Sequence, residues 1–109
     1  MHQVINYTLM KKLHKDQILV LRKGIVVSQV SFYQVIRSTS RTCDVRKLRK
    51  RIIEQKYNEQ KVEPIANDFI EPSIRCPVLN SGCVKIREKS YAWPWKGDPE
   101  WQTLMIFIP

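Results

Sequence analysis

The chain has 109 residues, of which 43% are apolar and 27% charged, which suits one domain with a modest core and excludes a disordered tail. Its formal net charge of +9 favours a polyanionic partner such as RNA, DNA or anionic lipid. No apolar run approaches the roughly 18–20 residues of a membrane span, and three cysteines are too few for a disulfide framework.

The excess charge lies in one half of the expected single domain, residues 1–109. Residues 1–51 hold 12 Lys and Arg against two acids, a net charge of +10. Residues 52–109 hold seven Lys and Arg against eight acids, a net charge of −1. The basic half is therefore the expected anion-binding part. The small and odd number of cysteines indicates a reducing, intracellular compartment, either cytoplasmic or nuclear. An organellar presequence is the alternative.

The first expected elements precede the basic run. Residues 4–13 predict a short amphipathic helix, because apolar side chains recur there at fourfold spacing. Residues 18–36 are mostly β-branched or aromatic, which favours two strands around Lys23-Gly24. A helical stripe fits residues 25–37 equally well, so the sequence leaves open whether they form a strand or a helix.

An amphipathic basic helix over about residues 44–60 is the strongest prediction. Thr42 or Asp44 can cap its amino terminus, where the carboxylate of Asp44 is also favoured. Val45, Leu48 and Ile52 would share one helical face and pack on the core. The cations between them would then project to the opposite side.

A hairpin over residues 73–89 is expected next, with Asn80-Ser81-Gly82 as its loop and Gly82 in the left-handed conformation. This register pairs Val78 with Val84. It places the following side chains on one buried face: Ile74, Cys76, Val78, Val84 and Ile86. Residues 103–108 predict a final buried strand.

These elements predict an α+β fold in which the helix packs on an antiparallel sheet that includes the 73–89 hairpin. The alternative is a winged helix-turn-helix, with the basic helix preceded by a second helix and the hairpin as its wing.

The predicted function is non-enzymatic nucleic-acid binding through the cationic helix face, with RNA slightly favoured over DNA. Five of the six residues from Arg46 to Arg51 are cations, and a neutralising phosphate backbone would relieve their repulsion. A solvated helix face or a nuclear-localisation signal would produce a similar string. The candidate contacts are Arg46, Lys47, Arg49, Lys50, Arg51, Arg37, Arg41, Lys11 and Lys12.

The aromatic segment 91–101 offers a second interpretation. Its four aromatic residues could stack on unpaired bases, or could bind a protein in a regulatory module of the viral accessory kind. Packing in the core or in an interface is the more common role of tryptophan beside proline. They are Tyr91, Trp93, Trp95 and Trp101. The third alternative is a winged-helix DNA binder, and the oligomeric state is undetermined.

No cofactor, metal site or catalytic residue is predicted. The cysteines lack paired C-x-x-C spacing, and no phosphate-loop or nucleophile-elbow motif occurs. Glu63, Asp68 and Glu71 form an acidic cluster, which we interpret as solubilising loop residues rather than a nuclease centre.

Overall fold

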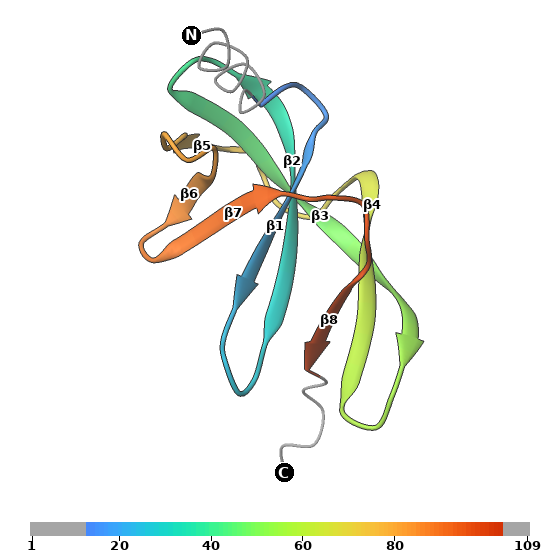
Figure 1. Cartoon of the computed structure of the whole chain (residues 1–109). Helices are drawn as coiled ribbons and strands as arrows, with labels where there is room; N and C mark the ends of the chain where they lie inside the picture. Colours follow the sequence, from blue (N-terminus) through green and yellow to red (C-terminus); the bar gives the residue numbers. More distant parts are fainter. Residues whose placement is uncertain (1–12, 104–109) are drawn as a thin grey trace, which may run out of the picture.

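The computed structural model describes residues 13–103, which form an antiparallel sheet and contain no helix (Figure 1). The strands are β1 (Ile18–Lys23), β2 (Gln29–Ser38), β3 (Thr42–Gln55), β4 (Glu59–Phe69), β5 (Ile74–Pro77), β6 (Val84–Arg87), β7 (Ser90–Pro94) and β8 (Glu100–Thr103). Their order in the sheet is β6-β7-β1-β2-β3-β4-β8, and β5 pairs with β3. The predicted α+β class and its winged-helix alternative are therefore wrong.

The segment that was predicted to be a basic helix forms strand β3. Its apolar residues are buried on two opposite faces and not on one. Cys43 and Val45 are buried in one hydrophobic cluster, whereas Leu48 is buried in the other. Successive strand residues point to opposite faces, so Val45 and Leu48, three positions apart, fall on different sides. A strand that is buried on both faces thus imitates the spacing of an amphipathic helix. Ile52, the third residue of the supposed apolar stripe, is 54% exposed.

Within residues 13–103, two hydrophobic clusters form the core, one on each face of the central strands. In β1, Leu19 and Leu21 belong to the first cluster and Val20 to the second. Around these, the first cluster contains Leu13, Tyr33, Val35, Cys43, Val45, Cys76, Val84, Ile86 and Ala92. The second contains Val30, Phe32, Leu48 and Val62, with Ile18, Phe69 and Trp95 packed against it. β6 and β7 therefore contribute to the first cluster, and β4 contributes to the second.

Two local predictions are confirmed. The strands expected around Lys23-Gly24 are β1 and β2, and residues 29–38 are strand rather than helix. In the 73–89 segment Val78 bridges Val84 as expected. However, β5 pairs mainly with β3, and β6 pairs with β7. Ile74, expected to be buried, is 41% exposed. The helix expected over residues 4–13 and the strand over 103–108 lie almost wholly outside the described residues.

A large bulge interrupts the pairing of β4 with β3. The register passes from Leu48 opposite Phe69 to Lys50 opposite Pro64, so residues 65–68 bulge out of the ladder. Within this bulge Asn67 adopts a φ of 66°. The buried side chain of Gln34 holds it there: Gln34 Nε2 donates to Asn67 Oδ1 at 2.9 Å, and Asn67 N donates to Gln34 Oε1 at 2.9 Å.

Phe32 provides a test of the second cluster. Its side chain is fully buried, and its ring packs edge-on against Trp95 with a centroid distance of 5.8 Å. We expect Phe32→Ala to lower the free energy of unfolding by about 3–5 kcal/mol, because a large cavity replaces the ring. Urea unfolding monitored by tryptophan fluorescence measures this, with Ile25→Ala (98% exposed) as the control expected within about 0.5 kcal/mol of wild type.

Cys43 and Cys76 lie directly opposite each other on β3 and β5, as buried free thiols. Burial raises the pKa of Cys43 to about 11. The unfolded chain therefore ionises this thiol first, and its contribution to stability is lost as the pH rises towards the folded pKa. We expect the free energy of unfolding to fall between about pH 8 and about pH 11, and to fall less steeply in Cys43→Ala. Parallel slopes in both proteins would contradict this assignment.

Candidate anion-binding site

The cations of the basic run do not share one face, and most are partnered by acids from β4 and the segment after it. Arg51 Nε lies 2.7 Å from Glu63 Oε2, and Arg49 Nε lies 3.2 Å from Asp68 Oδ2. Lys47 Nζ is 3.9 Å from a carboxylate oxygen of Glu71. These three acids are the cluster that the sequence predicted to be merely solubilising. They instead neutralise the basic strand across the sheet.

Arg46 and Lys50 are engaged by other groups. Arg46 Nε donates to the Glu71 carbonyl oxygen at 2.6 Å, and its guanidinium lies 4.6 Å from the centroid of the Phe69 ring. Lys50 Nζ, half-buried, donates to the Val30 carbonyl oxygen and to Gln102 Oε1. Burial lowers the pKa of Lys50. The cationic helix face is therefore replaced by a strand whose charges are largely satisfied within the molecule.

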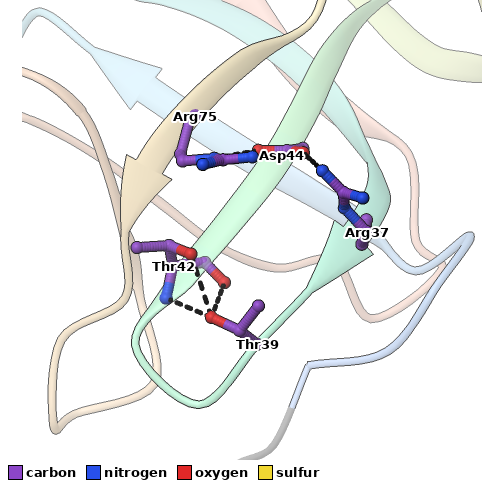
Figure 2. A pocket seen from close by; sticks show the side chains of 5 residues that line it. All are labelled: Arg37, Thr39, Thr42, Asp44 and Arg75. Atoms are coloured by element: carbon purple, nitrogen blue, oxygen red, sulfur yellow. Dashed lines mark hydrogen bonds and ion pairs between the residues drawn. The ribbon is translucent and has the colours of Figure 1, made fainter.

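A different cationic site lies at the turn between β2 and β3. A hollow of about 190 Å³ opens there, lined by Arg37, Thr39, Thr42, Asp44 and Arg75 (Figure 2). Arg37 belongs to β2 and Asp44 to β3, while β5 brings Arg75 alongside because Asp44 and Arg75 are paired in register. Three strands therefore assemble the site.

One carboxylate holds the two arginines in place. Arg75 Nε donates to Asp44 Oδ1 at 3.0 Å, and Arg37 Nη2 donates to Asp44 Oδ2 at 3.2 Å, so the carboxylate lies between the two guanidiniums (Figure 2). The hydrogen bond from Arg75 is the main cause of a lowered pKa at Asp44. The side chains of Arg37 and Arg75 remain 68% and 64% exposed. Each guanidinium thus keeps N–H donors directed to solvent.

The threonines shape the turn itself. Thr39 Oγ1 accepts hydrogen bonds from the backbone N–H groups of Arg41 (3.3 Å) and Thr42 (3.1 Å). It also lies 2.9 Å from Thr42 Oγ1 (Figure 2). The carbonyl oxygen of Arg41 accepts from Val78 N, which ties the turn to the chain after β5. The exposed side chain of Arg41 therefore projects from a well-defined turn.

These groups favour an anion. Arg37, Arg41 and Arg75 supply three positive charges against the one carboxylate of Asp44, a local net charge of +2. Guanidinium pairs bind phosphate or carboxylate oxygens through parallel N–H donors. Among the described residues, no aromatic side chain lines the hollow. The site can therefore bind an oxyanion but offers no surface on which a base could stack.

Two of the predicted phosphate contacts lie at this turn. Arg37 lines the hollow, and Arg41 lies in the turn beside it. Arg75 was not among the predicted contacts, and Asp44 was predicted to cap a helix. Lys11 and Lys12 lie outside the described residues.

The aromatic residues do not form one surface. Tyr91 and Trp93 lie partly exposed on β7, whereas Trp101 lies on β8 at the other end of the strand order. Trp95 packs on Phe32. Its Nε1 donates to the Asp98 carbonyl oxygen at 2.7 Å. A continuous stacking platform over residues 91–101 is therefore not what the fold presents.

Within residues 13–103 no group of three His, Cys, Asp or Glu side chains is placed to hold a metal ion, and no helix there is long and apolar enough to cross a membrane. Comparison with known proteins found no family model, no curated protein and no solved structure that matches the chain.

The pKa of Asp44 tests the geometry of the site. Because Arg75 is the main cause of its lowering, Arg75→Gln should raise the pKa of Asp44 towards its ordinary value of about 3.9. The Asp44 contribution to stability, present above that value and lost as the pH falls, should shrink with it. A carboxyl-detected NMR titration measures the shift, and an unchanged titration would show that the pair does not form in solution.

Proposed function

We propose that this chain is a non-enzymatic nucleic-acid-binding protein whose phosphate contacts are made at the turn between β2 and β3. The observation that carries the proposal is the pair of exposed guanidiniums, Arg37 and Arg75, held on either side of Asp44 at the mouth of a hollow. Arg41 adds a third cation to the same turn. Fixed arginines suit phosphate oxygens better than mobile charges, because less conformational entropy is lost on binding.

The distribution of ion pairs supports this position over the basic run. The cations of Lys47, Arg49 and Arg51 already face carboxylates, so a phosphate there would compete with an existing partner. At the turn, Asp44 pairs with Arg37 and Arg75, and Arg41 projects from the same turn. The turn therefore carries more uncompensated positive charge than the basic run does.

The chemistry of the hollow favours backbone contacts over base readout. Its lining consists of guanidinium, hydroxyl and carboxylate groups, and phosphate contacts of this kind position a nucleic acid without reading its sequence. Affinity should therefore depend steeply on salt and only weakly on base sequence. RNA remains the first candidate. One assay that compares single strands, duplex RNA and duplex DNA decides between RNA and DNA.

The test removes the three arginines together. We expect Arg37→Gln, Arg41→Gln and Arg75→Gln combined to weaken RNA binding at least tenfold at about 50 mM salt. The slope of log affinity against log salt, measured up to about 200 mM, should fall by about one unit for each phosphate that the variant can no longer neutralise. Fluorescence anisotropy with labelled RNA and DNA gives both quantities, and circular dichroism checks the fold.

A matched control removes the same charge from β3. Lys47→Gln, Arg49→Gln and Arg51→Gln combined also lower the net charge by three, but these cations are paired in the folded chain. This variant should keep most of the affinity. Equal losses in both variants would mean that net charge, and not the turn, governs binding. Absence of binding by the wild-type protein at about 50 mM salt would refute the function itself.

A further inference from the structure

The end of the molecule opposite the arginine site presents two hairpin turns, with the end of β8 between them (Figure 1). Because β1–β4 are antiparallel, the β1–β2 turn (residues 24–28) and the β3–β4 turn (residues 56–58) lie at the end away from the β2–β3 turn (Figure 1). β8 connects them. Thr103 hydrogen-bonds with Ser28 on the first hairpin and pairs with Glu59 on the second.

These two turns expose large apolar side chains. Ile25 and Val26 are 98% and 90% exposed, and Tyr57 is 96% exposed. No other large hydrophobic side chain in the described part of the chain is exposed to this degree. Single exposed apolar residues are normal on a protein surface, whereas exposed apolar side chains that are grouped, as Ile25 and Val26 are, indicate an interaction surface. We call Ile25, Val26 and Tyr57 the apolar tips.

The first turn is fixed in shape rather than loosely attached. Gly24 has a φ of +92°, and a Cβ at this position would lie 1.9 Å from the Val27 carbonyl oxygen. Only glycine is therefore accommodated, and the turn holds Ile25 and Val26 away from both hydrophobic clusters. The second turn is closed by the hydrogen bond from Lys56 N to the Glu59 carbonyl oxygen at 2.8 Å.

A lysine accompanies each tip. Lys23 precedes Gly24 and Ile25, and Lys56 precedes Tyr57; both lysines are exposed. Aliphatic residues that protrude beyond flanking lysines match the boundary of a bilayer, where the apolar groups enter and the ammonium groups meet lipid phosphates. Tyrosine also suits this boundary, because its ring is apolar and its hydroxyl polar.

The surroundings disfavour other partners. The tips lie at the ends of protruding hairpins (Figure 1), which suits insertion into a lipid surface better than the binding of a peptide in a groove. Near the second turn Glu54 pairs with Lys61, so Glu59 is the remaining acid beside the two exposed lysines of the turns.

We propose that the apolar tips dock this end of the protein onto an anionic lipid bilayer, with Ile25 and Val26 entering the boundary between headgroups and acyl chains. Lys23 and Lys56 contact lipid phosphates from either hairpin. The arginine site at the opposite end then points away from the membrane, so the two surfaces act independently.

Vesicle flotation tests this docking. The wild-type protein should float with vesicles of phosphatidylcholine mixed with phosphatidylserine, and less with phosphatidylcholine alone. Ile25→Ser combined with Val26→Ser should reduce the bound fraction about tenfold or more, because both side chains lose their transfer into lipid. The matched control is Ile70→Ser combined with Ile74→Ser, which removes two partly exposed isoleucines (43% and 41%) away from the tips and should leave flotation unchanged.

Three results would overturn the proposal. They are a wild-type protein that binds neither vesicle, tip substitutions without effect, and loss of flotation only when Arg37, Arg41 and Arg75 are replaced. Light scattering separates a further case: a dimer that the tip substitutions dissociate would show that a second copy covers the tips. The tip variant should keep its affinity for RNA, so failure here and failure of the proposed function are distinguishable.

Discussion

Strand β3 is paired along both of its edges, and the rest of the fold depends on this pairing. β2 pairs along one edge of this strand, and β5 and β4 share the other edge in succession. Both faces of the strand are also buried, by Val45 on one side and Leu48 on the other. A slip of one residue would exchange these faces and bury neighbouring cations, so packing and register fix each other.

The same strand shows why the charge of a segment does not describe the surface that the segment forms. Its cations meet Glu63 and Asp68 of β4, which lie in the near-neutral half of the sequence. Exposed pairs of this kind stabilise a protein by only about 0–1 kcal/mol each. Their main effect is to neutralise a strand whose cations would otherwise repel one another. The arginines that stay outside this arrangement come from β2, from a turn and from β5.

The sequence was sufficient for features that depend on local chemistry. The Lys23-Gly24 turn and the contact between Val78 and Val84 follow from glycine positions and β-branched runs. The secondary structure of residues 44–55 could not be predicted from local chemistry. The spacing of apolar residues alone does not distinguish a helix that is buried on one face from a strand that is buried on two. The site was partly visible in Arg37 and Arg41. Arg75 could not be found, because it joins Asp44 only through a strand pairing across about thirty residues of sequence.

The bulge at residues 65–68 divides the sheet into two parts that differ in how they hold together. On one side of the bulge, β3 lies within the buried clusters. On the other side, residues 49–61 form a ribbon that is largely exposed on both faces, and β8 pairs along its β4 edge. Local opening costs least where few apolar side chains are buried and backbone hydrogen bonds reach water. We therefore expect the backbone amides of this ribbon to exchange with solvent faster than those of β1 and β2, most of all towards the 56–58 turn, beyond the hydrogen bonds that tie Lys50 to Val30 and Gln102. The molecule thus combines a buried body with an exposed arm that is held at its base.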